Sequence, residues 1–352
     1  MTTNDRELRL ELPGGFWQAR LVLVAVSGGS DSLALVRALL GQRSRLAQEL
    51  SVPEVLAFHF DHQWHDGSAA LARWVEQTLQ ECGVATIVRR RSDISETCSD
   101  GSVNSEPSLQ SEGEARELRY KAMTTVAKSL GASFVLTGHT CDDQAETVLM
   151  RIARGTGLAG LAGIPQQRHL TDQCTVLRPL LHESRQRLRE YLSRIGQAFW
   201  DDPTNTDDRW TRNRVRQTVL PWLRQNLAPE IDQALVRLGD LARDHQVMVQ
   251  HLAEQHRAAV LELGDNHLII DVKQWEELPE SLVRSLLVYW WGQAQFPQRD
   301  MDFEHWSQLT TVARRPESEA VQRRWPSQVH LPAHIVAKRS GGVLRIVAVS
   351  RS

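Results

Sequence analysis

Residues 21–32 have the sequence LVLVAVSGGSDS, which decides the fold of the first half of the chain. The first six residues form an apolar, valine-rich run that predicts a buried strand. A Gly-Gly pair between serines follows, and the apolar pattern of residues 33–50 predicts a helix directly after it. Because the glycines allow a tight turn, successive N–H groups can converge on an anion beside the positive end of the helix dipole. The stretch therefore predicts a pyrophosphate-binding loop between a strand and a helix.

A helix-capping turn is the alternative interpretation of this loop, since serine and aspartate both cap helices. A cap needs one such residue, whereas the loop supplies three serines, two glycines and Asp31 in succession. Asp31 would repel a phosphate unless a cation lay between them, so it favours a bound Mg²⁺. The loop lacks the lysine of a Walker A motif and the spacing of a dinucleotide fingerprint.

Strands and helices alternate through the first half of the chain. The further expected strands are residues 55–60, 85–88 and 134–137, and the further expected helices are residues 68–82, residues 114–130 and one that starts near Asp142. This alternation predicts an α/β fold, a parallel sheet with helices on both faces. Ligands of such sheets bind beyond the carboxyl ends of the strands, where the loop lies.

Residues 92–113 interrupt the alternation, because they are rich in Ser, Gly and Glu and hold almost no large apolar side chains. Such a segment cannot bury enough surface to order itself. We expect a mobile loop there, either a lid over the site or a tolerated insertion.

The second half of the chain has a different pattern. Apolar residues recur in heptad-like steps between residues 229 and 263, which predicts a long helix with one packed face. Beyond it, a small α+β domain is expected, with strands at 267–272, 329–336 and 343–349 and helices at 280–295 and 301–313. The expected parts are a catalytic domain (1–225), a helical linker (226–264) and a C-terminal domain (265–352).

The composition, 352 residues with 41% hydrophobic and 24% charged side chains, is typical of a folded globular chain. The net charge of −2 excludes a polycation but allows a local basic patch. No apolar stretch approaches the ~20 residues of a membrane span, and the first 15 residues are polar and acidic, unlike a signal peptide. We expect a cytoplasmic protein with no membrane partner. The four cysteines, Cys82, Cys98, Cys141 and Cys174, contain no pair at two-residue spacing and predict neither a zinc ribbon nor a redox dithiol.

A second motif narrows the family. Residues 137–147 have the sequence TGHTCDDQAET and are followed by Arg151, Arg154, Gly155 and Gly157-Leu158. Together with the loop, this motif resembles the signature of the tRNA(Ile)-lysidine synthetases, a branch of the PP-loop (N-type) ATP pyrophosphatases. The resemblance covers about residues 21–223 and includes FDH at 60–62, EAR at 114–116, Arg119-Tyr120, DDPTN at 201–205, RNRVR at 212–216 and LP at 220–221.

Two positions depart from the family pattern. Trp64-His65 stand where the family usually has a Leu-Arg pair, and Thr140 replaces its usual second histidine. Neither departure removes an acidic or phosphate-binding residue, so only a role of the missing side chains is affected.

The resemblance implies a reaction of ATP, free L-lysine and a tRNA-Ile with a CAU anticodon, on an adenine nucleotide α-hydrolase-like sheet. The carbonyl oxygen on carbon 2 of the wobble cytidine attacks the α-phosphorus of ATP, and pyrophosphate leaves. The ε-amine of lysine then attacks carbon 2 and displaces AMP, which gives lysidine and changes the codon read from AUG to AUA. Mg²⁺ would assist, and the C-terminal domain would bind tRNA. The oligomeric state stays open, with a homodimer among the alternatives.

The resemblance, with the chemistry of the side chains, also assigns the site residues. The ATP-binding set is Ser27, Gly28, Gly29, Ser30, Asp31, Ser32, Asp61, His62 and His139, with Asp31 as the Mg²⁺ ligand. The catalytic set is Asp31, Arg116, Arg119 and Glu146, where one of the two arginines would neutralise charge at the α-phosphate. The lysine-binding set is Asp142, Asp143 and Glu146, and the tRNA-binding set is Arg151, Arg154, Arg212, Arg214 and Arg216.

Structural interpretations compete with several of these roles. Asp142 and Glu146 are four residues apart and share a helix face, but Asp143 also matches a capping box with Thr140. His139 at a strand end could be merely structural. Residues 178–224 hold ten arginines against six acids, which favours phosphate contacts. Within this stretch, a solvated helix face is the preferred interpretation for Arg185, Arg187, Arg189 and Arg194.

Two alternative functions fit parts of the sequence. A tRNA 2-thiolase would share the phosphate loop, but its chemistry usually needs paired cysteines, which the chain lacks. An RNA-binding protein with an inactive nucleotide site would be expected to lose the Gly-Gly pair or Asp31, and both are present.

Overall fold

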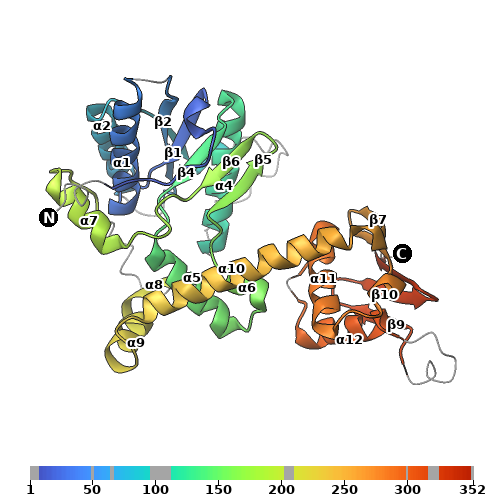
Figure 1. The fold of residues 1–352 in the computed structure, drawn as a ribbon. Coiled ribbons are helices and arrows are strands. Elements are labelled where there is room, and N and C mark those ends of the chain that lie inside the picture. The colour runs from blue at the N-terminus through green and yellow to red at the C-terminus, as the bar shows by residue number, and fades with distance from the viewer. Residues whose placement is uncertain are drawn as a thin grey trace. The chain divides into compact units, whose positions relative to one another are not determined.

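The computed structural model describes residues 8–48, 51–63, 67–95, 112–201, 210–298, 300–315 and 325–349. The chain divides into two compact units, each with its own sheet (Figure 1). The first unit comprises Met1–Gly155 and Gly163–Gly239, and the second comprises Thr156–Ala162 and Asp240–Ser352. Most of the expected loop at 92–113 lies outside the described residues, as do Trp64, His65 and residues 202–209.

The sheet of the first unit has six strands in the order β3-β2-β1-β4-β6-β5. They are β1 (Leu21–Ala25), β2 (Glu54–Asp61), β3 (Ala85–Arg90), β4 (Phe134–Thr137), β5 (Gln167–Thr171) and β6 (Cys174–Leu177). Every neighbouring pair is parallel except β5–β6, which forms an antiparallel hairpin at the edge. The predicted α/β fold is confirmed, and the edge hairpin is an addition that the alternation did not predict.

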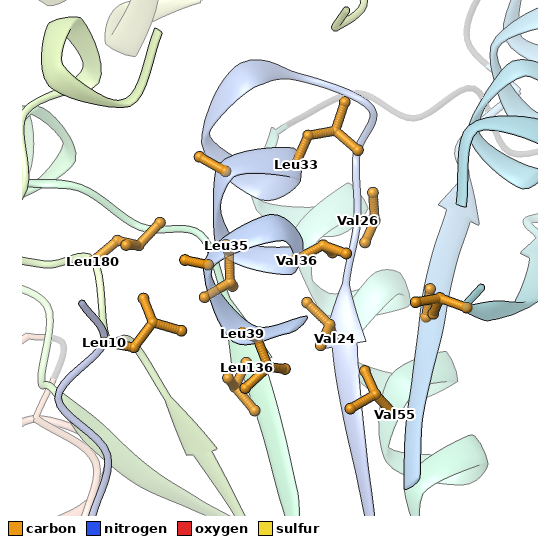
Figure 2. Close-up of a cluster of buried hydrophobic side chains, with 14 of the residues drawn as sticks. Leu10, Val24, Val26, Leu33, Leu35, Val36, Leu39, Val55, Leu136 and Leu180 are labelled. Carbon is orange, nitrogen blue, oxygen red and sulfur yellow. The ribbon is translucent and has the colours of Figure 1, made fainter. Parts of the chain in front are cut away.

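Helices cover both faces of this sheet because alternate residues of β1 point to opposite sides. Val22 and Val24 pack with α1 (Ser30–Leu46), α2 (Ser68–Glu81) and α7 (Arg185–Arg194). Figure 2 shows part of this cluster, with Leu33 and Val36 of α1 beside the β1 strand. Leu21 and Leu23 pack on the other side with α4 (Glu112–Leu130). The carboxyl ends of the central strands are thereby left open between the two helical layers.

The remaining helices of the first unit are short, apart from one. They are a 3-10 turn η2 (Phe16–Gln18), α3 (Ser92–Ser95), α5 (Cys141–Arg154), α8 (Thr211–Arg214), a π-helical turn η4 (Val215–Val219) and α9 (Leu220–Asn226). The last three form one continuous helical segment, Thr211–Asn226. In a helix Arg212 and Arg216 share a face and Arg214 points elsewhere, so their alternate spacing in the sequence does not place all three together.

Among the described residues, none of the helices combines the length and the hydrophobicity that a membrane span requires. The second unit contains a five-stranded antiparallel sheet in the order β7-β8-β11-β10-β9. The strands are β7 (Val260–Gly264), β8 (His267–Asp271), β9 (Gln328–Leu331), β10 (Ile335–Ser340) and β11 (Val343–Ala348). They pack with α11 (Glu280–Gln293) and α12 (Phe303–Ala313) around Trp275 and Trp291. The long helix α10 (Ile231–Gln255) runs through the boundary between the units, and α6 (Leu158–Leu161) belongs to the second.

The single strand predicted at 329–336 is wrong. β9 and β10 are separate strands joined by a turn in which Ala333 and His334 both have a φ of 59°. Pro332, which precedes them, lacks the N–H that a strand in mid-sheet would donate.

Arg339 is a buried cation of the second unit whose removal gives a first prediction. Its side chain donates to the carbonyl oxygens of Ala313 (2.6 Å) and Gly341 (2.8 Å) and to Glu276 Oε1 (3.2 Å). Arg339→Met leaves these acceptors unpaired, and we expect the free energy of unfolding to fall by about 2–4 kcal/mol. Urea unfolding followed by tryptophan fluorescence measures this loss. The exposed neighbour Lys338→Met should change it by less than about 0.5 kcal/mol, and equal losses in both variants would contradict the assignment.

Candidate active site

A cavity of about 720 Å³ lies at the carboxyl ends of β1, β2 and β4, where the α/β fold predicts a ligand site. The phosphate loop forms one side, and residues from α4, α7 and the 211–226 segment form the others. Most of the residues predicted for ATP and catalysis line it. They are Ser27, Gly29, Ser30, Asp31, Ser32, Asp61, His62, Arg116, Arg119 and His139.

The loop is held closed by its own serines. The N–H of Ser27 donates to Ser32 Oγ (3.2 Å), and that hydroxyl donates to the carbonyl oxygen of Gly29 (2.9 Å). Gly29 is the N-cap of α1, and no side chain caps the helix. The capping interpretation is therefore wrong for this loop. The first N–H groups of α1 lack partners within the helix, so they are placed to bind an anion.

Gly28 gives the loop its turn and a second prediction. Its φ is +94°, and a Cβ would lie 2.8 Å from Leu71 Cδ1 and 3.0 Å from Val75 Cγ2. Gly28→Ala should therefore lower the free energy of unfolding by about 1–3 kcal/mol, and weaken ATP binding by shifting the loop. Chemical denaturation and nucleotide titration measure the two effects. Gly41→Ala, in open space within the same α1 helix, should instead stabilise by about 0.5–1 kcal/mol. A neutral Gly28→Ala would contradict the strain.

His139 is half-buried beside the loop. Its Nδ1 lies 2.9 Å from Thr137 Oγ1. Burial lowers its pKa to about 3, and nearby arginines add to this against the opposing charge of Asp143. His139 is thus neutral at pH 7 and can offer a hydrogen bond to a phosphate. The preceding Gly138 lets the backbone at the end of β4 lie close to the phosphate loop, since a Cβ there would lie 3.0 Å from the backbone of Asp31.

Asp61 is the last residue of β2 and His62 follows it, and both lie on the cavity wall. Asp61 is buried, and its Oδ1 accepts from the N–H of Gln63 (2.8 Å). The ring of His62 packs edge-on against Phe60, with centroids 4.7 Å apart. His59 of β2 also lines the cavity, although the sequence does not predict it as a site residue. Its Nδ1 lies 2.8 Å from the carbonyl oxygen of Val26, which follows β1.

Three acids and three arginines form one cluster, which we call the acid–arginine cluster: Asp31, Asp143, Glu146, Arg185, Arg212 and Arg216. Asp143 Oδ1 accepts from Arg185 (3.1 Å), Arg212 (3.1 Å) and Arg216 (3.4 Å). Glu146, with only 1% of its side chain exposed, accepts from Arg212 Nε (2.7 Å) and Arg216 Nε (2.6 Å). The formal charges of the six side chains cancel.

The pKa values of the acids show how the cluster divides its charge. Burial opposes the ionisation of Asp143, but Arg212 and Arg185 outweigh it, so its pKa lies below the ordinary value. Burial raises the pKa of Asp31, and the nearby charge of Arg185 opposes that shift. Asp143 is therefore held ionised, while Asp31 is a carboxylate that a further cation would stabilise.

The predicted pairing of Asp142 with Glu146 is not observed. Asp142 Oδ2 accepts from the N–H of Arg185 (2.8 Å) at the start of α7, and Asp142 does not line the cavity. Asp143 and Glu146, three residues apart on α5, converge instead. Asp143 also completes the capping box of α5: Thr140 is the N-cap, and Asp143 Oδ2 accepts from the Thr140 N–H (2.9 Å), while Oδ1 accepts from the arginines. The structural and the functional interpretations of Asp143 are thus compatible.

Arg185 is a charged site residue that the sequence interpretation missed. It was expected on a solvated helix face, yet only 19% of its side chain is exposed, and it contacts Asp31, Asp143 and Glu146. Arg187, with 51% of its side chain exposed, fits the solvated interpretation, whereas Arg189, with 52% exposed, also lines the cavity. The first turn of α7 meets α5 only through the tertiary fold, so no local pattern distinguishes Arg185 from its neighbours.

The arginines predicted for tRNA lie in different surroundings. Arg212 and Arg216 lie in the acid–arginine cluster, whereas Arg214 is exposed and donates to Thr211 Oγ1 (3.2 Å). Arg151 donates to the carbonyl oxygen of Gly163 (3.0 Å), and Arg154 is exposed at the end of α5. Neither Arg151 nor Arg154 lines the cavity.

The two catalytic arginine candidates flank Tyr120. The guanidinium carbons of Arg116 and Arg119 lie 5.2 and 6.0 Å from the centre of its ring. Arg168 lies on the same ring (4.8 Å), and the buried Arg178 donates to the Tyr120 hydroxyl (3.3 Å). Of these residues, Tyr120, Arg116 and Arg119 line the cavity, so this wall carries two arginine cations.

Comparisons with known proteins support the resemblance found in the sequence. Residues 4–223 match the model of the PP-loop domain family. The chain is 43% identical to a tRNA(Ile)-lysidine synthase of Salinispora arenicola over 62% of this chain and 61% of that protein. It is 32% identical to a tRNA(Ile)-lysidine synthase of a Synechococcus species over 86% of each. Three of the curated relatives are matched over only 61 to 65% of their length.

A solved structure has a similar fold. It is a U34-tRNA thiolase from Methanococcus maripaludis, with a TM-score of 0.50 and 18% identity over 64% of this chain and 72% of that chain. At this identity the likeness concerns the fold alone. The family model, which spans more than half of the chain, and the Synechococcus match over most of both proteins together establish the family. The chain belongs to the tRNA(Ile)-lysidine synthase family of PP-loop proteins.

Proposed function

We propose that this chain uses ATP to join free L-lysine to carbon 2 of the wobble cytidine in the CAU anticodon of a tRNA-Ile. One observation carries the proposal: the phosphate loop and five of the six members of the charge-balanced acid–arginine cluster line the same cavity, and the sixth, Glu146, is buried against Arg212 and Arg216. A free amino acid brings an ammonium and a carboxylate, and a neutral cluster of both signs can bind the two. The names of the relatives support this substrate class.

The first step is the adenylation of the base. The N–H groups of the loop and of the first turn of α1 would bind the phosphates, with the hydroxyls of Ser27 and Ser30 beside them. Arg116 and Arg119 line the cavity and would offset the charge that grows at the α-phosphate. The cytidine oxygen attacks the α-phosphorus and pyrophosphate leaves, which makes AMP the leaving group for the second step.

Mg²⁺ fits this site through Asp31. No group of three His, Cys, Asp or Glu side chains among the described residues is arranged to hold a metal. Asp31 is the one carboxylate of the phosphate loop, residues 27–32. One is enough, because Mg²⁺ commonly binds through one or two carboxylates together with phosphate oxygens. Bound there, Mg²⁺ would neutralise phosphate charge. The raised pKa of Asp31 indicates a carboxylate that such a cation would stabilise.

The second step is the transfer of lysine. Asp143 lines the cavity and is held ionised, so we assign it to the lysine ammonium. A lysine carboxylate would compete with Glu146 for Arg212 and Arg216, and drawing them away would uncover Glu146. The ε-amine has a pKa of ~10.4 in water and arrives protonated, so a base is needed. Glu146 is our candidate for that base.

The tRNA would approach with its cytidine turned out of the stack, as enzymes that act on bases generally require. The exposed Arg154 and Arg214, with Arg151, would contact its phosphates. The C-terminal part of the chain, residues 265–352, would bind another part of the tRNA.

Labelled lysine, ATP and a panel of tRNAs test the proposal. Label should enter only a tRNA-Ile with the CAU anticodon, and only when ATP is present. A methionine tRNA with the same anticodon is the matched control and should stay unlabelled. Labelling without ATP, or none with any tRNA, would contradict the proposal.

A further inference from the structure

The guanidinium of Arg185 connects two parts of the cavity, the phosphate loop with Asp31 and the proposed lysine site with Asp143. We call these parts the two halves of the cavity. The Nε of Arg185 donates to Asp31 Oδ2 (3.0 Å) at the phosphate loop, and its Nη2 donates to Asp143 Oδ1 (3.1 Å) in the proposed lysine site. Its Nη1 lies 3.7 Å from Glu146 Oε1. The residue is anchored through its own N–H by Asp142 (2.8 Å). The backbone is thus held in place while the charged end bridges three carboxylates.

Asp31 is already occupied by these contacts. Its Oδ1 accepts from the Ser30 hydroxyl (3.0 Å), and its Oδ2 accepts from Arg185. In the proposed function, the same carboxylate binds the metal that accompanies the triphosphate. A guanidinium and a divalent cation repel each other, so both cannot bind one carboxylate oxygen at full strength. Arg185 and the metal therefore compete for Asp31.

We propose that Arg185 is a positioning residue that binds Asp31 in the nucleotide-free protein and releases it when a metal-bound triphosphate enters. Asp143 and Glu146 provide the alternative partners, because they already contact Arg185. The exchange needs only rotation of the side chain end, and it leaves no carboxylate buried without a cation. Since binding at one half changes the partner of Arg185 in the other, the two halves are energetically coupled. This inference rests on the proposed metal role of Asp31, but not on the tRNA or lysine chemistry.

Binding of Mn²⁺ to the protein alone tests the inference. Electron paramagnetic resonance can count free Mn²⁺ with no nucleotide, lysine or tRNA present. Arg185→Gln removes the competing charge, and we expect Mn²⁺ to bind about tenfold more tightly than in the parent chain. Arg212→Gln removes the same charge from the cluster without touching Asp31, and should change the Mn²⁺ affinity much less. The exposed Arg187→Gln should leave the affinity unchanged.

A double variant locates the effect. Adding Asp31→Asn to Arg185→Gln should abolish the gain, because the metal then lacks its carboxylate. Arg185→Lys keeps the charge with fewer donors, so its Mn²⁺ affinity should lie between that of the parent and that of Arg185→Gln. This variant still tests the inference if Arg185→Gln folds poorly. An unchanged or weaker Mn²⁺ affinity in both Arg185 variants would overturn the inference, as would a gain that survives Asp31→Asn. Failure of the lysine-labelling assay with a normal Mn²⁺ result would count against the proposed reaction and not against this exchange.

Discussion

The Asp31→Asn variant should release pyrophosphate from ATP about a thousandfold more slowly than the parent chain. The substitution removes the carboxylate that would hold Mg²⁺ at the phosphates, and such a metal supplies several kcal/mol of charge stabilisation. The fold should survive, since asparagine keeps the shape of the side chain and Arg185 retains Asp143 and Glu146. Affinity for tRNA should be nearly intact. The measurement is pyrophosphate release with ATP and tRNA, alongside a tRNA-binding assay.

Asp172→Asn is the matched control for this variant. Asp172 is an exposed carboxylate in the β5–β6 turn, outside the cavity. Its loss should leave the rate of pyrophosphate release unchanged. An active Asp31→Asn variant would remove the metal role of Asp31 and the basis of the Arg185 exchange.

Glu146→Gln should separate the two steps of the reaction. The loop, Asp31 and the Tyr120 arginines are untouched, so adenylation proceeds. Transfer of lysine should fall by about 10²- to 10⁴-fold, the usual contribution of a general base. Glutamine retains an acceptor for Arg212 or Arg216, which limits the loss of stability. Adenylated tRNA should therefore accumulate, and nuclease digestion with mass spectrometry would detect it.

Glu190→Gln provides the comparison, since Glu190 is exposed on α7 and its carboxylate accepts a hydrogen bond from the side chain of Gln186 (2.9 Å). It should transfer lysine at the parent rate. Equal losses of adenylation and transfer in Glu146→Gln would instead indicate that the cluster is needed to hold the whole cavity in shape.

The sequence predicts the features of this protein that depend on local chemistry. The strand, the Gly-Gly turn and the start of α1 follow one another in the chain, so the phosphate loop could be located to the residue. The capping box of Thr140 and Asp143 is equally local. The order of the strands then places both motifs at the carboxyl ends of two neighbouring central strands, β1 and β4, which is why most predicted ATP-site residues line a single cavity.

The missed features depend on contacts distant in sequence. Arg185 enters the site because α7 starts against α5, 42 residues earlier in the chain, and its periodicity resembles that of the solvated Arg187. Asp142 leaves the site for the same reason, as it binds the first N–H of α7. Arg212 and Arg216 were grouped with Arg214 by spacing, whereas the helix divides them between the cluster and the surface.

Pyrophosphate release in the absence of lysine tests most directly whether ATP adenylates the wobble cytidine or the amino acid. With ATP and the CAU-anticodon tRNA-Ile, we expect a burst of about one pyrophosphate per cavity, with AMP attached to the wobble cytidine. Adding lysine should then release AMP and restore turnover. Pyrophosphate that appears only after lysine is added, with AMP bound to the amino acid, would contradict activation of the base at this loop.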